Sequence, residues 1–141
     1  MWLLIAAVAA ILWRRPSIVA WVLAGDLIAD LTAYGLRVAI DRDRPPLRFP
    51  EPHALVGVPN NPSFPSGHSA TSFACAALLA WLTPLPKVPL FALAALIASS
   101  RVYNGVHYPL DVVAGAALGL AVATALRLLA GARRRSAPAP R

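Results

Sequence analysis

Long apolar runs, separated by short polar or proline-containing breaks, dominate this sequence and limit what it can fold into. The runs cover residues 1–13, 17–40, 66–83, 88–100 and 108–130. Hydrophobic residues make up 58% of the chain and charged residues only 13%, well below the quarter that is usual in soluble domains. Because a membrane-spanning helix needs about 20 mostly apolar residues, the pattern predicts an integral membrane protein. A length of 141 residues suggests one domain.

The runs predict an all-α transmembrane helical bundle of about five membrane helices, of which the first is short. The run 1–13 is too short to span alone, so either the recorded start lies inside a longer helix or this is a partial span. It lacks the basic start of a signal peptide. The run 88–100 is also short and could extend through Tyr103. We expect a membrane domain over residues 1–130 and a basic, disordered cytoplasmic tail over residues 131–141.

The basic residues predict how the bundle is oriented. Short loops rich in lysine and arginine face the cytoplasm, and the breaks carry Arg14–Arg15, Lys87 and Arg133–Arg135. If all three sites face the cytoplasm, successive predicted helices cross the membrane in opposite directions, as a bundle requires. The ends from Arg37 to His68 and from Arg101 to Asp111 then face outward. The basic loops and tail of this topology account for the net charge of +7. The sequence has no basic face interleaved with aromatic residues, which a nucleic-acid-binding protein would show.

Two aspartates lie inside the run 17–40. Asp26 and Asp30 share a helical face that continues through Ala33 and Arg37. A charge near the bilayer centre costs about 3 kcal/mol, so this face should point inward. We expect Asp26 to pair with another helix. Asp30 either does the same or orients a basic active-site residue, and the sequence leaves both possibilities open.

Other residues are expected to have structural roles. Cys75, the single cysteine, lies inside an apolar run and is predicted to be a packing residue. The connection 41–65 contains seven prolines and is predicted to lack regular structure, with His53 as a plain loop residue. Gly115 and Gly119 are spaced for close helix contact. Asn104 is expected to form a turn.

The predicted orientation brings polar residues from distant parts of the sequence to one outer face. They are Arg37, Arg44, Ser66, Gly67, His68, Arg101, His107 and Asp111. Three arginines suit the oxygens of a phosphate group. Helices that begin near Ser66 and Pro109 would add two N-termini, which favour an anion, and Gly67 would let backbone N–H groups approach it closely.

Two histidines at a phosphate suggest a nucleophile and a general acid/base. Asp111 follows His107 by four residues, so its carboxylate can hold one ring nitrogen and leave the other free. His107 is therefore the predicted nucleophile and His68 the predicted acid. Taken alone, this stretch has another interpretation, in which Arg101 and Asp111 are interfacial anchors and His107 is a capped surface residue. No cluster of carboxylates could hold magnesium, so we expect a metal-free mechanism without a cofactor.

These residues resemble the type 2 phosphatidic acid phosphatase superfamily of lipid phosphate phosphatases, in its membrane-bound bacterial type. Three ordered motifs within residues 37–111 carry the resemblance: Arg37 with Arg44-Pro45, then Pro65-Ser66-Gly67-His68, then Ser100-Arg101 with His107 and Asp111. The family usually has lysine where this chain has Arg37. The compact ammonium group of lysine is thus replaced by a planar guanidinium, which can donate two parallel hydrogen bonds to a phosphate. Its membrane form usually has six helices, whereas four full runs and one partial run occur here.

The resemblance implies hydrolysis of a lipid phosphate monoester or an isoprenyl diphosphate through a phosphohistidine. His107 would attack phosphorus, Asp111 would orient its ring, and His68 would protonate the leaving group and then activate water. Phosphate would be held by Arg37, Arg44, Ser66, Gly67 and Arg101. Together with the charge pattern, the resemblance predicts a multi-pass enzyme of the cytoplasmic membrane whose active site faces outward. The placement of the charges gives no reason to expect a nucleic acid partner.

The sequence leaves several functions open. Undecaprenyl- or decaprenyl-diphosphate phosphatase and prenyl-phospho-sugar phosphatase are not separated by the motifs. A non-catalytic phospholipid-binding or transport protein would need the arginines but not both histidines. A small scaffold subunit would use Asp26 and Asp30 as partner contacts. The long apolar runs exclude a soluble acid phosphatase or haloperoxidase of the same superfamily.

Overall fold

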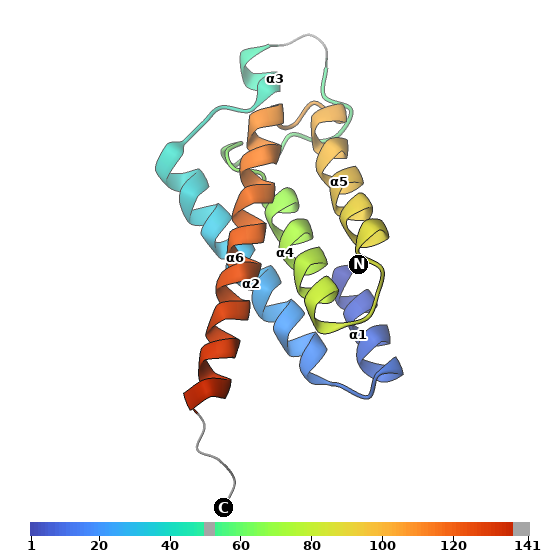
Figure 1. Ribbon diagram of the computed structural model, residues 1–141. Helices are drawn as coiled ribbons and strands as arrows, with labels where there is room; N and C mark the ends of the chain where they lie inside the picture. The colour runs from blue at the N-terminus through green and yellow to red at the C-terminus, as the bar shows by residue number, and fades with distance from the viewer. Residues whose placement is uncertain (50–52, 137–141) are drawn as a thin grey trace, which may run out of the picture.

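The computed structural model describes the backbone of residues 1–49 and 53–136, and the side chains of these residues as far as Ala132. This part of the chain is all-helical, as predicted, with five long helices and one single-turn helix (Figure 1). They are α1 (Trp2–Leu12), α2 (Ser17–Ile40), α3 (Pro45–Arg48), α4 (Gly67–Leu82), α5 (Lys87–Tyr103) and α6 (Pro109–Ser136). Among the described residues, helices α2 and α6 are long and apolar enough to cross a membrane.

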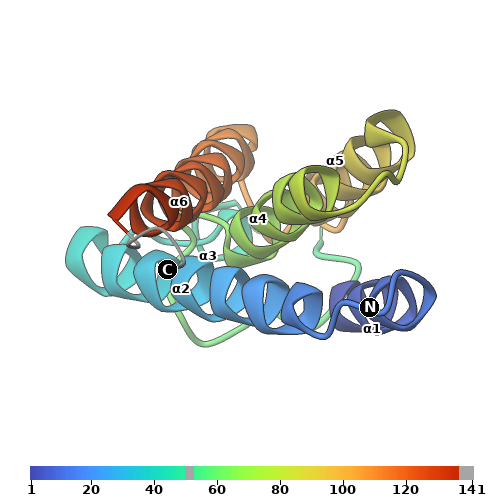
Figure 2. The same ribbon diagram turned by 60° about the horizontal axis from the view of Figure 1, so that its bottom comes forward.

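The central element is α4, which packs against α1, α2, α5 and α6. Figure 2 shows it between α5 and α6, with α2 crossing beneath them. Its buried side chains are mostly small, and they include Ser69, Ala70, Ala74, Cys75 and Ala76. Small residues let helix backbones approach closely in a membrane, where burial of apolar surface does little to drive helices together. The sequence of α4 therefore suits a helix that is surrounded by others.

Two glycines bring α6 against α4 at the end where α4 begins. A Cβ added at Gly115 would overlap the carbonyl oxygen of Ser66, and one added at Gly119 would overlap that of Ala70. The predicted role of Gly115 and Gly119 in close helix contact is confirmed. The backbone N–H of Ser66 also donates to the carbonyl oxygen of Asp111 at 2.9 Å, so the first turns of α4 and α6 are held together.

Three segments extend or interrupt the predicted runs. The helix α5 continues through Tyr103, as the sequence allowed. The helix α6 continues to Ser136, beyond the expected end near Ala130, so the prediction of disorder was wrong for residues 131–136, while residues 137–141 lie outside the described part. The prediction that the connection 41–65 lacks regular structure was wrong for Pro45–Arg48, which form one helical turn with prolines in its first two positions, where a missing N–H costs nothing.

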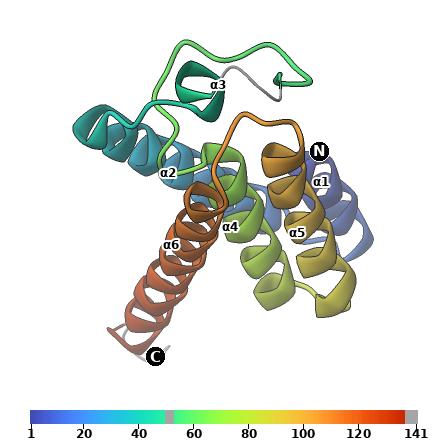
Figure 3. The same cartoon turned by 90° about the horizontal axis from the view of Figure 1, so that it is seen from above.

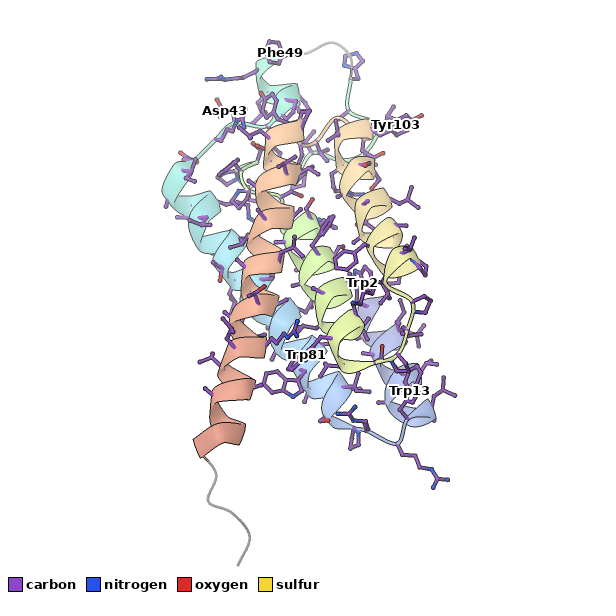
Figure 4. All side chains as sticks on the ribbon, viewed as in Figure 1. Trp2, Trp13, Asp43, Phe49, Trp81 and Tyr103 are labelled. Carbon is purple, nitrogen blue, oxygen red and sulfur yellow. The ribbon has the colours of Figure 1, made fainter. Side chains whose placement is uncertain are left out.

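The two ends of the bundle differ in what they carry. The α1–α2 and α4–α5 turns lie at the same end as the C-terminal part of α6, while α3 and the α5–α6 turn lie at the other (Figures 1 and 3). Figure 4 places Trp13 and Trp81 toward the first end and Asp43, Phe49 and Tyr103 at the second. Arg14 and Arg15 lie in the turn before α2, and Lys87 begins α5. Each is therefore separated by a helix from the motif residues Arg37 and Arg101, in keeping with the alternation that the charge pattern predicted.

We expect Gly119→Ala to destabilise the fold by about 2 kcal/mol, because overpacking a tight contact usually costs about 1–3 kcal/mol. Gly35→Ala is the matched control, since a Cβ there meets nothing within 4 Å, and replacing a helical glycine by alanine stabilises a helix by up to about 1 kcal/mol. Thermal unfolding midpoints of both variants in detergent measure the difference. Equal midpoints for the two variants would contradict the close contact of α4 with α6.

Candidate active site

His107 and Asp111 meet at the turn between α5 and α6. Gly105 has a φ of 71°, which reverses the chain after α5 and is a conformation that glycine adopts without steric cost. His107 then precedes Pro109, the first residue of α6, so it lies beside a helix N-terminus as predicted. Nδ1 of His107 lies 3.4 Å from Oδ2 of Asp111. His107 is only 4% exposed and Asp111 0%, which contradicts the interpretation of His107 as a capped surface residue and of Asp111 as an interfacial anchor.

The carboxylate of Asp111 has further partners. Its Oδ2 accepts a hydrogen bond from the backbone N–H of Tyr108 at 2.9 Å. Asp111 is the third residue of α6 and Tyr108 its N-cap, so this is the contact of a capping box. Oδ1 of Asp111 accepts from Nη1 of Arg42 at 2.8 Å. The Arg42 guanidinium stacks on the ring of Tyr108, 4.1 Å from its centroid. Asp111 is therefore fixed from two connections at once.

Arg42 was not predicted as a site residue. No sequence signal separated Arg42 from Arg48, which is an arginine of the same proline-rich connection. Asn61 was also missed. Its side-chain oxygen accepts from Nη2 of Arg44 at 2.6 Å, and its backbone oxygen accepts from Nε at 2.8 Å. No sequence pattern indicated this contact, because it depends on how the proline-rich connection folds back.

Arg44 determines which ring nitrogen of His107 carries the proton. Nη1 of Arg44 lies 3.2 Å from Nε2 of His107 and donates to the carbonyl oxygen of Val106 at 2.8 Å. A guanidinium can only donate hydrogen bonds, so Nε2 must present its lone pair. The proton of a neutral imidazole then lies on Nδ1, the nitrogen that faces Asp111. This is the form in which Nε2 can act as a nucleophile.

Arg37 lies over the first residue of α4. A Cβ added at Gly67 would be 2.9 Å from Nη1 of Arg37, so the guanidinium lies against the backbone of this glycine and a larger residue would displace it. Arg37 is 9% exposed, and its buried Nε has no hydrogen-bond partner within the described residues. Nη2 lies 3.7 Å from Oδ1 of Asp30. Of the two roles left open for Asp30, the structure favours the orientation of a basic site residue.

Asp26 has a different environment from Asp30. Its Oδ1 lies 3.6 Å from Sγ of Cys75, which donates to it from α4. The prediction that Asp26 pairs with another helix is confirmed. Cys75 is fully buried, as expected of a packing residue, and its thiol is in addition a hydrogen-bond donor. Asn104 caps the end of α5, and its carbonyl oxygen accepts from the backbone N–H of Leu55 at 3.1 Å, in keeping with its predicted place in a turn.

His68 faces the same region from the first turn of α4. Ser66 caps this helix, and its Oγ accepts from the backbone N–H of Ser69 at 3.4 Å. Desolvation lowers the pKa of His68, and the charges of Arg101, His107 and Arg37 lower it further, whereas the charge of Asp30 raises it, because nearby cations disfavour and a nearby anion favours the charged ring. The backbone N–H of Ser66 donates to the carbonyl oxygen of Asp111, so His68 lies two residues from a contact with the first turn of α6. Arg101 is partly buried, and its Nε lies 3.4 Å from Oγ of Ser100.

The eight residues predicted for the site thus lie together at one end of the bundle. Contacts link Arg44 to His107, His107 to Asp111, Asp111 to Ser66 and Arg37 to Gly67, and electrostatic interactions link His68 to Arg101. The described residues contain no group of three or more histidine, cysteine or acidic side chains that could hold a metal ion. The arrangement offers a cationic, histidine-containing site for an anion such as phosphate.

We expect the pKa of His68 to lie below the ordinary imidazole value, so the ring is mostly neutral at neutral pH in the empty site. Arg101→Gln removes a positive charge and should raise this pKa toward about 6.5. NMR titration of the His68 ring in detergent measures the change. Arg48→Gln is the control, because Arg48 is exposed and pairs with Asp43. A pKa that is unaltered by Arg101→Gln would place Arg101 away from His68.

Comparison with known proteins identifies the family of this chain. A model of the PAP2 superfamily matches residues 16–135. Decaprenylphosphoryl-5-phosphoribose phosphatase of Mycobacterium tuberculosis is 36% identical over 140 residues, covering 96% of this chain and 75% of that protein. Lipid A 1-phosphatase of Rhizobium etli is 49% identical over 57 residues, covering 40% of this chain and 25% of that protein.

A solved structure shares the fold. The transmembrane PAP2 type phosphatidylglycerolphosphate phosphatase of Bacillus subtilis aligns with a TM-score of 0.73 and 26% identity, over 96% of this chain and 70% of that one. The helical bundle, the matched family model and the long alignment with a phosphatase all agree. The chain therefore belongs to the PAP2 superfamily, as a membrane-bound phosphatase.

Proposed function

We propose that the protein removes a terminal phosphate from a prenyl-linked membrane lipid, with His107 as the nucleophile. The observation that carries the proposal is the environment of His107. Nε2 is unprotonated and presents its lone pair toward Arg44, and Nδ1 faces the buried carboxylate of Asp111. An imidazole held in this form has one unprotonated ring nitrogen, whose lone pair has a fixed direction. A non-catalytic phosphate-binding site would have no need of that form.

In the first step, Nε2 of His107 forms a bond to phosphorus as the bond to the leaving oxygen breaks. His68 donates a proton to that oxygen, which departs as an alcohol or a phosphate. The positive charge that develops on the His107 ring is stabilised by the carboxylate of Asp111, whose Oδ2 lies 3.4 Å from Nδ1. Because desolvation and the neighbouring cations keep the pKa of His68 low in the empty site, the negative charge of the bound phosphate is what makes His68 available as an acid.

In the second step, water attacks phosphorus and the bond to Nε2 breaks. The neutral His68 accepts the proton of the water, and inorganic phosphate is released. The phosphoryl oxygens lie between Arg37, Arg101 and the first turn of α4, where Ser66 and the Gly67 amide also bind them. Nη1 of Arg44 already lies beside Nε2, so it can transfer its hydrogen bond to an oxygen of a phosphorus atom bonded there.

The substrate class rests on the relatives. The alignment that covers 96% of this chain is with an enzyme named for a decaprenylphosphoryl-5-phosphoribose substrate, which favours a prenyl-phospho-sugar phosphate. A putative undecaprenyl-diphosphatase of Escherichia coli is 46% identical over 59 residues, covering 41% of this chain and 30% of that protein. An isoprenyl diphosphate is therefore the second candidate. Both carry a terminal phosphate on a lipid too long to leave the membrane.

The protein is proposed to lie in the cytoplasmic membrane with its active site facing outward. The turns that carry Arg14, Arg15 and Lys87 lie at the end opposite to the site (Figure 1), and basic turns stay on the cytoplasmic side. Of the other candidate functions, a scaffold role for the intramembrane aspartates has less support. Asp26 and Asp30 each have a partner within this chain.

We expect His107→Ala to lower phosphate release by at least about 10³-fold, the scale on which loss of a nucleophile acts. The substrates are phosphatidic acid, an isoprenyl diphosphate and a prenylphosphoryl-5-phosphoribose, assayed in detergent with a chelator present. His53→Ala serves as the control, and it should retain activity near that of the unaltered protein. Activity that survives His107→Ala would refute the nucleophile, and tight binding of these lipids without turnover would favour a non-catalytic role.

Arg42→Gln should lower kcat about 10- to 100-fold with little change in KM, because Arg42 positions Asp111 and does not reach the phosphate. Arg42→Lys should recover part of the loss, since lysine keeps a charge for the carboxylate and for the ring of Tyr108. Arg48→Gln is the matched control in the same connection, because Arg48 is exposed and contacts neither group. A kcat unaltered by Arg42→Gln would mean that the ion pair has only a structural role.

A further inference from the structure

A second basic site lies at the end of the bundle opposite to His107. Between the α1–α2 turn, the end of α4 and the later part of α6 there is a cavity of about 330 Å³, lined by Arg15, Trp81, Leu82, Arg127, Ala130 and Gly131. This is within the size range of small-molecule sites, which begins near 300 Å³. None of its lining residues belongs to the catalytic cluster. We refer to it as the two-arginine cavity.

The charge of the two-arginine cavity is not compensated by the protein. Its lining contains two arginines and no acidic residue. Neither Arg15 nor Arg127 takes part in any ion pair of the described residues. Arg15 makes one long hydrogen bond, from Nη1 to the carbonyl oxygen of Leu82 at 3.4 Å. Both guanidiniums therefore keep most of their donors available for an anion, and their planar forks suit phosphate oxygens.

Apolar surface continues from the two-arginine cavity along the helices. An adjoining cavity of about 260 Å³ is lined by Trp21, Leu126, Leu129 and Ala130, and it shares Ala130 with the first. Leu129 is largely exposed. Trp21 and Trp81 stand edge to face, with ring centroids 5.8 Å apart, and tryptophans concentrate at the depth of lipid headgroups. The basic part thus opens onto a surface that suits a hydrocarbon chain.

We propose that the two-arginine cavity binds an anionic phospholipid of the leaflet opposite to the active site. The headgroup phosphate pairs with Arg15 and Arg127, and an acyl chain lies along Trp21, Leu126 and Leu129. Basic pockets between membrane helices on the cytoplasmic side are suited to anionic headgroups. A free phosphate ion would use the arginines but not the adjoining apolar cavity, so the continuity of the two cavities favours a lipid. The proposal does not depend on the catalytic roles proposed above.

The full chain, delipidated in detergent, tests the proposal by native mass spectrometry and thermal unfolding. Phosphatidylglycerol should bind at least tenfold more tightly than phosphatidylcholine and should raise the unfolding midpoint more. Phosphatidylglycerol is chosen because it has a phosphodiester and no terminal phosphate to be hydrolysed. This comparison needs no variant, so it stays informative even if an altered chain fails to fold. Equal binding of the two lipids would overturn the proposal, as would inorganic phosphate that binds as tightly as phosphatidylglycerol.

Substitutions of the lining arginines test whether the lipid binds in the two-arginine cavity. Arg15→Gln and Arg127→Gln should each weaken phosphatidylglycerol binding about tenfold, the loss expected for one charge-assisted contact. Arg14→Gln is the matched control, because Arg14 carries the same charge in the same turn but does not line the cavity. Phosphate release by all three variants should stay near that of the unaltered protein, which separates this site from the catalytic one. Equal effects of Arg14→Gln and Arg15→Gln would reduce the finding to general surface charge and refute a built site.

Discussion

The buried carboxylate of Asp111 is the group on which the rest of the site depends. Asp111 is fully buried, and a buried charge is tolerated only when it is paired and hydrogen-bonded. Its partners are Arg42 from the connection after α2, the backbone of Tyr108 from the turn before α6, and the ring of His107. One side chain therefore joins two connections that are distant in the sequence. The same contacts hold the imidazole in the orientation that a nucleophile requires.

The close approach of α4 and α6 places the second half of the site. Gly115 leaves room for the carbonyl oxygen of Ser66, and the N–H of Ser66 donates to the backbone of Asp111. The first turns of both helices therefore lie side by side, and their N–H groups and positive dipole ends favour an anion between them. Arg37 reaches this region from α2, and its guanidinium lies against Gly67.

Much of this arrangement could be predicted, because hydropathy and motif spacing are properties of short stretches of sequence. The apolar runs predicted the long helices, and the basic turns predicted which ends meet. The errors occurred where the apolar pattern stops. The single turn at Pro45–Arg48 forms in a segment interpreted as irregular, and α6 continues to Ser136, since backbone hydrogen bonds can extend a helix beyond the residues that a membrane would cover.

The sequence by itself determined the all-helical membrane class and the residue types for phosphate chemistry, since both follow from side-chain polarity. It could not distinguish Arg42 from Arg48, which are arginines of one proline-rich connection. Only the tertiary structure places Arg42 against a buried carboxylate 69 positions away and leaves Arg48 exposed. Asp30, for which the sequence left two roles open, is likewise assigned by its neighbours. Such pairings depend on how helices pack, and the packing of distant segments is not encoded in the spacing along any one of them.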